Sequence, residues 1–239
     1  MKRRTFLSGV GVSLTGLAGC LGGGGGSGDD KILVVDGETI YLTPVDKTYE
    51  WYKNGEAKFA DARGESAYQS SHIEGAVSSP ANSPISNSPV EKWSKDQKIV
   101  CYCGCPHHLS SVRAAELQKA GYKDVSVIDE GFYEWQERGY PVTGSSNSSK
   151  YEIRGQTDAS FEGETVMLRW QSANGMEPLE AAFVEPDGSY AMTVHFDGVT
   201  PESVVSLEAP DYSVETTLGA LTTQVVTADS VESLERPKK

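Results

Sequence analysis

The chain has 239 residues and carries 34 acidic against 21 basic side chains, which gives a formal net charge of −13 at pH 7. A surface this acidic repels phosphate groups, so the charge argues against a nucleic acid or an anionic lipid surface as the direct partner. The length predicts one or two domains.

Residues 1–20 predict an export signal. A basic start precedes residues 5–19, an apolar, Gly-rich stretch that is too short to span a bilayer. Residues 3–7 (RRTFL) resemble a twin-arginine signal, and residues 17–20 (LAGC) resemble a lipobox. Together they imply export in the folded state and lipid attachment at Cys20, on the outer face of the cytoplasmic membrane. The alternative is a plain cleaved signal with an incidental cysteine.

Residues 21–30 are Gly-rich and predict a flexible tether between that anchor and the folded part. Acidic groups are concentrated at the other end of the chain, since residues 144–239 carry 16 acidic and 6 basic groups. The acid excess, the twin-arginine pattern and the lipobox together favour a halophilic source.

Strand and helix patterns alternate through residues 31–143, which we expect to form the first domain. Alternation of this kind predicts a parallel sheet covered by helices. In such sheets the reactive groups gather at the carboxyl ends of the strands. The expected strands are residues 31–35, 59–62, 99–102 and 125–128, and the expected helices are residues 44–53, 110–120 and 132–138.

Three cysteines, Cys101, Cys103 and Cys105, alternate through the end of the third expected strand and the loop after it. A thiol placed where a strand meets a helix faces the unpaired N–H groups and the positive dipole end of that helix. Both favour the thiolate over the thiol. The stretch therefore predicts a nucleophilic cysteine in an anion-binding loop.

Residues 98–122 resemble the active-site segment of the rhodanese family of sulfurtransferases. Residues 59–81 are similar to the Asp-x-Arg and His-Ile-x-Gly-Ala segments of that family, and residues 125–142 to its closing strand and Gly-Tyr-Pro-Val exit. The resemblance covers about residues 40–143 and implies an α/β rhodanese-like fold. It also implies transfer of sulfane sulfur from a small anionic donor such as thiosulfate, through a cysteine persulfide, to a thiol acceptor, with no cofactor.

The loop departs from the usual pattern of the family, in which an Arg follows the cysteine by five residues. Here no Arg lies between Cys101 and Val112. Reading from the strand, the Tyr-Cys ending points to Cys103 as the nucleophile, whereas reading back from the helix points to Cys105. We favour Cys103, with Cys105 as a resolving or auxiliary thiol.

The resemblance implies roles for further residues around the loop. Arg113 is the weakest substrate-binding candidate, and we expect it to point to solvent. Asp61 and Arg63 should organise the fold around the site, and His72 should be a structural turn residue. The substrate-binding candidates are Gly104, His107, His108, Leu109, Ser110, Ser111 and Arg113.

Two other functions compete with sulfur transfer. Cys103, Cys105, His107 and His108 are four soft ligands within six residues and suit zinc or copper(I), although so tight a cluster cannot easily surround a tetrahedral ion. Alternatively, a rhodanese-like fold without the loop Arg is a non-catalytic interaction module.

Gly, Ser and Asn fill residues 144–149, which predicts a linker. The patterns after it are strands only, separated by Asn-Gly and Asp-Gly turns. They predict a small all-β domain of immunoglobulin-like sandwich type over residues 150–230. Residues 231–239 should be a frayed tail. The expected strands are residues 165–170, 190–196, 204–207, 212–217 and 221–226.

This second domain contains no catalytic constellation. Its one histidine, His195, lies within an expected strand and should be structural. We expect an accessory or binding role, with a protein as the partner. Because the pattern changes at a linker, the two domains should fold independently.

Overall fold

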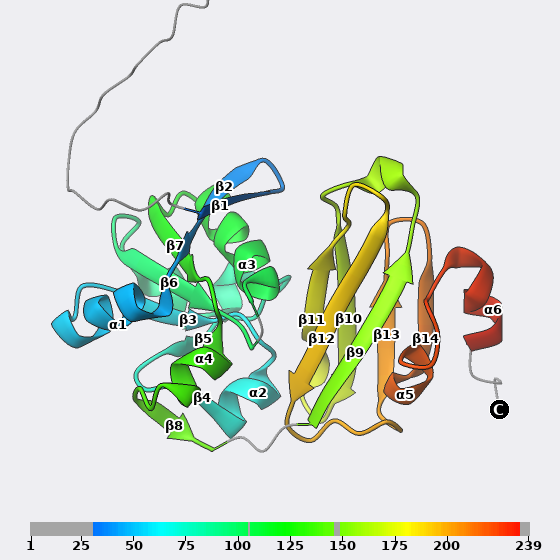
Figure 1. Cartoon of the computed structure of the whole chain (residues 1–239). Coiled ribbons are helices and arrows are strands. Elements are labelled where there is room, and N and C mark those ends of the chain that lie inside the picture. The colour runs from blue at the N-terminus through cyan, green and yellow to red at the C-terminus, as the bar shows by residue number, and fades with distance from the viewer. Residues whose placement is uncertain (1–30, 105, 146–148, 235–239) are drawn as a thin grey trace, which may run out of the picture.

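The structure is a computed structural model, and it describes residues 31–104, 106–145 and 149–234. Figure 1 shows two lobes side by side, an α/β lobe and a lobe made mostly of strands. The elements of the first lobe are β1 (Lys31–Val35), β2 (Glu38–Thr43), α1 (Val45–Asn54), β3 (Lys58–Asp61), α2 (Glu65–Ser70), β4 (Ser71–Ile73), β5 (Val77–Ser78), two 3-10 turns (Ile85–Asn87 and Pro89–Lys92), β6 (Lys98–Tyr102), α3 (His108–Lys119), β7 (Asp124–Ile128), α4 (Phe132–Glu137) and β8 (Val142–Gly144).

The main sheet of the first lobe has the strand order β1-β2-β7-β6-β3-β5. Strands β2, β7, β6, β3 and β5 run parallel, as predicted, but β1 is antiparallel to β2. The sheet is therefore mixed, and the sequence analysis missed β2. The sheet is mixed because β1 and β2 form a hairpin. The two residues of its turn, Asp36 and Gly37, are both at positive φ.

Helices cover both faces of this sheet. On one face α3 packs on β2, β6 and β7, and it is buried nearly all round. On the other face the indole of Trp135 in α4 is fully buried and contacts the rings of Tyr49, Tyr52 and Phe59 edge-on or tilted. The sheet thus positions the loop between β6 and α3 at the carboxyl ends of its strands, where the sequence predicted the site.

The second lobe consists of antiparallel sheets. The strand order is β11-β10-β13-β14 in one sheet and β12-β9 in the other. These sheets share one apolar cluster, so the predicted all-β character fits, while the immunoglobulin-like type stays a prediction. The elements are β9 (Ser149–Gln156), a 3-10 turn (Ala159–Phe161), β10 (Thr165–Ser172), β11 (Gly175–Phe183), β12 (Ser189–Phe196), β13 (Val204–Glu208), β14 (Ser213–Thr217), α5 (Leu218–Leu221), a 3-10 turn (Ala228–Ser230) and α6 (Val231–Leu234).

Four features of the second lobe differ from the prediction. Strand β9 begins at Ser149, inside the expected linker, and β11 was missed because its Pro178 and buried acids obscure the strand pattern. The strand expected at residues 221–226 is wrong, since α5 ends at Leu221. Residues 231–234 are helical rather than frayed, because Leu234 is buried against the lobe.

The apolar core of the first lobe continues into the second. Met167 and Ala181, on β10 and β11, belong to the same buried cluster as Leu109 and Val112 of α3, and Phe183 packs against it. In return, Ala67 of α2 joins the core of the second lobe. Most buried apolar residues nevertheless cluster within their own lobe, and independent folding of the two lobes stays a prediction.

Candidate active site

Cys103 directly follows β6, at the carboxyl end of the strand, where the sequence placed it. Its side chain is 0% exposed, and its Sγ lies 3.4 Å from the Oγ of Ser110 in the first turn of α3. The carbonyl of Cys103 accepts a hydrogen bond of 2.8 Å from the amide of Phe132, at the start of α4. Strand β6, α3 and α4 together fix this thiol in place.

The surroundings of Cys103 favour the neutral thiol. Burial, followed by the negative charge of Glu180, raises its pKa to about 12, although the hydrogen bond with Ser110 opposes the shift. The predicted lowering of the pKa is therefore wrong for this arrangement of the two lobes. A helix terminus stabilises a nearby anion by only about 0.3–1 kcal/mol when exposed, and removing a thiolate from water costs more than that.

The loop after Cys103 is short and closely packed. A Cβ on Gly104 would lie 3.0 Å from the ring of Tyr133, so that ring would have to shift by a few tenths of an ångström, and 3.7 Å from the carbonyl oxygen of His195, which is ordinary contact. Cys105 lies outside the described residues. Pro106 leads into His107, which precedes α3 at positive φ.

The two loop histidines face different partners. Nδ1 of His107 lies 3.1 Å from the carbonyl oxygen and 3.2 Å from Oδ1 of Asp129. His108 packs edge-on against the ring of Phe183 on β11. Burial, with a smaller contribution from His107, lowers the pKa of His108 to about 4, so this ring is neutral at pH 7 and adds no positive charge to the loop.

The remaining candidates on α3 are buried rather than open to a ligand. Leu109 lies in the apolar core, and the hydroxyl of Ser111 has no hydrogen-bond partner among the described residues.

Arg113 is fully buried, so the prediction that it points to solvent is wrong. Its guanidinium donates to Ser79 Oγ at 2.9 Å, to the Ser83 carbonyl at 2.8 Å and to the Glu116 carboxylate at 2.8 Å. It joins the segment before β6 to α3, and its charge opposes the rise that burial causes in the pKa of Cys101.

Asp61 and Arg63 form a buried ion pair at the end of β3. The guanidinium of Arg63 donates to both carboxylate oxygens, at distances between 2.6 and 3.2 Å, and to the Ser71 carbonyl at 2.6 Å. Burial opposes the charge of Arg63, but the Asp61 carboxylate outweighs it and raises the pKa of Arg63. His72 stacks on Tyr68 and contacts the Tyr68 carbonyl at 2.7 Å. His72 lies within strand β4 rather than in a turn, and the structural roles of the three residues stay predictions.

Sequence reasoning missed the residues that the second lobe brings to the loop. Glu180 of β11 is only 3% exposed, and its charge acts on Cys103. The ring of His195 on β12 lies tilted against that of Tyr133 with centroids 3.7 Å apart, and the Tyr133 hydroxyl donates to the His195 carbonyl. The signal in the sequence was a pair of acidic residues, Glu177 and Glu180, among apolar neighbours, and it did not identify a contact so distant in the chain.

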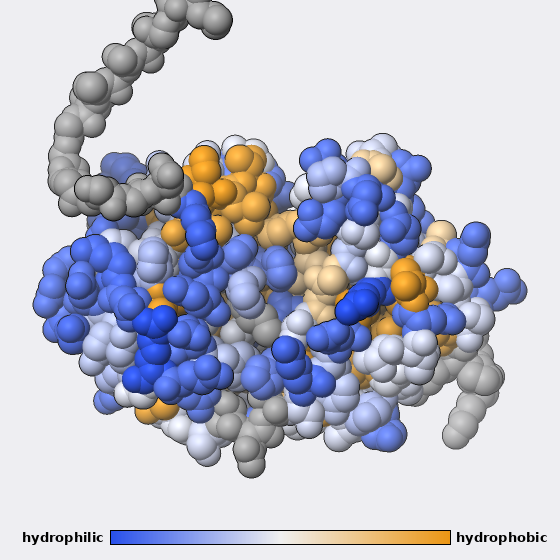
Figure 2. All heavy atoms as spheres, in the orientation of Figure 1, coloured by the Kyte–Doolittle hydropathy of each residue, from blue (hydrophilic) through white to orange (hydrophobic). Residues whose placement is uncertain are grey.

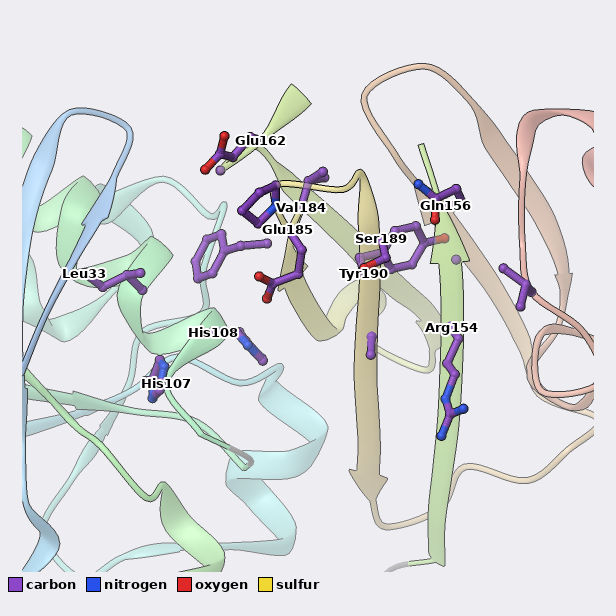
Figure 3. A pocket seen from close by; sticks show the side chains of 16 residues that line it. Leu33, His107, His108, Arg154, Gln156, Glu162, Val184, Glu185, Ser189 and Tyr190 are labelled. Atoms are coloured by element: carbon purple, nitrogen blue, oxygen red, sulfur yellow. The ribbon is translucent and has the colours of Figure 1, made fainter. Parts of the chain in front are cut away.

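A cavity of about 680 Å³ lies between the lobes beside the loop histidines. In Figure 3, Leu33, His107 and His108 form the wall on the first lobe, and Arg154, Glu185, Ser189 and Tyr190 belong to the second. Cys103 does not line this cavity. Solvent therefore reaches the start of α3 without reaching the thiol.

Comparison with known proteins supports the architecture of the first lobe. A family model described as the Rhodanese-like domain matches residues 45–138. These residues form a rhodanese-like domain. The match ends before the second lobe begins.

Individual relatives cover only part of the chain. An HTH-type transcriptional regulator from Mycobacterium tuberculosis is 30% identical over 90 residues, which are 37% of this chain and 38% of that protein. The chain thus spans well under half the length of this relative.

Similar solved structures also match the rhodanese-like domain. The BH2092 protein of Bacillus halodurans is 25% identical with a TM-score of 0.39, and the match covers 43% of this chain and 76% of that one. The rhodanese-like domain of an Anabaena protein is 23% identical with a TM-score of 0.39, covering 44% and 79%. A human single-domain sulfurtransferase is 16% identical with a TM-score of 0.36, covering 41% and 96%.

The described residues contain no group of three or more His, Cys, Asp or Glu side chains arranged to hold a metal ion. The metal-binding alternative also depends on Cys105, which lies outside them. That alternative therefore stays a prediction, and metal analysis of the purified protein tests it.

Proposed function

We propose that this protein is a sulfurtransferase that carries sulfane sulfur as a persulfide on Cys103, with Cys105 as the resolving or auxiliary thiol. The observation that carries the proposal is a cysteine at the carboxyl end of the central strand β6 of a rhodanese-like domain. Ser110 adds to it, because its hydrogen bond to Sγ favours the thiolate.

The chemistry consists of two displacements at sulfur. The Cys103 thiolate attacks the outer sulfur of a donor such as thiosulfate, the donor S–S bond breaks, and sulfite leaves with the electron pair. Cys103 then holds that sulfur as a persulfide. The thiolate of an acceptor takes the outer sulfur, and Cys103 leaves as a thiolate, so the cycle needs no external oxidant or reductant.

We expect the intact protein to gain the mass of one sulfur after incubation with thiosulfate. Cys103→Ser should abolish the gain, because it removes the nucleophile, whereas Cys105→Ser should retain it. Intact mass spectrometry measures both. A gain that survives Cys103→Ser and disappears in Cys105→Ser would assign the nucleophile to Cys105 instead.

A second candidate function is a non-catalytic interaction module, and the burial of Cys103 favours it. At a pKa of about 12, only about one thiol in 10⁵ is ionised at pH 7. The loop also lacks an Arg, and Glu180 adds negative charge where an anionic donor would bind. A variant whose Cys103 can be alkylated but gains no sulfur from thiosulfate would establish this alternative.

We also propose that the protein is exported and held at the membrane through a lipid on Cys20. No helix of the described residues is long and apolar enough to cross a bilayer. Figure 2 shows an apolar patch over β1 and β2, directly after the expected tether, where Ile32 and Val34 are 58% and 62% exposed. Such a patch next to the tether supports a position close to the lipid surface.

Replacing Cys20 by Ser should move the protein from the membrane fraction to the soluble exported fraction, because the acyl chains would have no attachment site. Cell fractionation followed by detection of the protein measures this. Replacing Arg3 and Arg4 together by Lys is the companion test, and it should block export. Unchanged membrane association in Cys20→Ser would refute the lipid anchor.

A further inference from the structure

The second lobe lies over the cysteine loop of the rhodanese-like domain. Strand β12 reaches the loop through Tyr133, whose hydroxyl donates to the His195 carbonyl and whose amide donates to the Gly104 carbonyl. Strand β11 packs on α3, the helix that follows the loop. Cys103 belongs to the buried cluster that includes Ala181 of β11 and Met167 of β10. The face at which the thiol would meet a donor is thus occupied by strands from another part of the chain.

Polar contacts hold this cover in place at two edges. Next to the loop, the Tyr133 hydroxyl donates to the His195 carbonyl. At α2, the hydroxyl of Ser70 donates to Asp197 at 2.7 Å, and Glu177 accepts from the Ser66 amide at 3.1 Å. Each of these bonds joins one lobe to the other.

Gly64 of the first lobe makes room for the Glu177 contact. A Cβ on Gly64 would lie 2.8 Å from the Glu177 Cβ, so only glycine at position 64 lets β11 approach α2 this closely. Ser66 also accepts a hydrogen bond from the Asn174 amide at 3.3 Å. The surfaces of α2 and β11 are therefore complementary in shape and in hydrogen bonding.

We infer that the C-terminal lobe is an intramolecular cover for the cysteine loop, and that Cys103 reacts only when this lobe moves away. Strand β8 ends at Gly144 and β9 begins at Ser149, so only a short segment connects the two lobes. The cavity beside His107 and His108 already separates part of the two surfaces. Opening would remove Glu180 from the thiol and expose the first turn of α3 to an anionic donor.

Only the chemistry of the opened site depends on the proposed sulfur transfer. Whether the C-terminal lobe covers Cys103 can be measured without any sulfur donor. Iodoacetamide is a neutral probe that alkylates an accessible thiol. Fragmentation mass spectrometry of the peptide that contains Cys101, Cys103 and Cys105 identifies which one is modified. In the full-length wild-type protein, Cys103 should be alkylated slowly, because only the open fraction reacts.

Tyr133→Phe and Ser70→Ala each remove one hydrogen bond across the interface without changing the cysteine loop. Each should raise the rate of Cys103 alkylation by about two- to tenfold, and the double variant by roughly the product, since a net hydrogen bond is worth a factor of that size. Tyr140→Phe is the matched control. Its hydroxyl donates to Asp46 at 2.6 Å within the first lobe, so its loss should leave the rate unchanged.

The dependence of the rate on urea separates opening from unfolding. Movement of one lobe exposes less surface than complete unfolding, so alkylation should depend on urea more weakly than the unfolding transition does. Rapid alkylation of Cys103 in the wild type would overturn the inference, because the thiol would not be covered. So would equal rates in wild type, Tyr133→Phe and Ser70→Ala, or a rate that follows global unfolding in every variant.

Discussion

Replacing Asp61 by Ala should destabilise the protein by about 3–5 kcal/mol, because it leaves a buried guanidinium without its counter-charge. Asp61 is 0% exposed and Arg63 is 4% exposed, and the pair makes three hydrogen bonds between the side chains. The guanidinium also lies over the ring of Phe132, at the start of α4, with its central carbon 4.3 Å from the ring centre. The loss should therefore reach the segment that holds the cysteine loop. Urea unfolding at pH 7 measures it.

Asp46→Ala is the matched control for this experiment. Asp46 also pairs with an arginine, Arg138, but its side chain is 66% exposed. Water solvates the remaining guanidinium there, so the midpoint of urea unfolding should change far less than in Asp61→Ala. Equal effects of the two substitutions would show that burial does not determine the strength of these pairs, and would contradict the organising role assigned to Asp61.

Lowering the pH from about 6.5 to about 4 should remove about 3 kcal/mol of stability through His108 alone. Burial against the second lobe lowers the pKa of this residue to about 4 in the folded protein, from an ordinary value of 6.5. Between these two values the unfolded chain binds a proton that the folded chain does not. The stabilising contribution of His108 is therefore complete above pH 6.5 and is lost as the pH falls towards 4.

His108→Phe isolates this contribution, because it keeps an aromatic ring against Phe183 and cannot be protonated. Urea unfolding of wild type and variant at several pH values between 4 and 7 gives the difference in slope. The wild type should lose more stability than the variant over this range. The contributions of carboxylates that titrate in both proteins cancel in the difference. Parallel curves would mean that His108 is not desolvated, and hence that the interface between the lobes is more open than the structure shows.

Acid should consequently loosen the same interface that covers Cys103. His108 lines the cavity between the lobes and is only partly buried, so a rise in the open fraction would hydrate its protonated ring more fully. This links the second prediction to the cover formed by the C-terminal lobe.

The sequence by itself determined the local elements of the rhodanese-like domain. The strands β3, β6 and β7 and the helices α1, α3 and α4 were all predicted within a few residues, because short apolar runs and Gly-terminated helical segments alternate there. It also located Cys103 at the end of β6. Both results depend on interactions between residues close in the chain, for which spacing is sufficient information.

Only the tertiary structure decided the state of the site. The sheet covers one side of α3 and β11 covers another. Helical spacing alone does not show which side of a helix is exposed to solvent, so the burial of Arg113 was not predictable. The pKa of Cys103 depends on Glu180, which is distant in the sequence and reaches the thiol only through the packing of two lobes. Desolvation and charge act through space, and the sequence order of these residues does not specify which of them become neighbours.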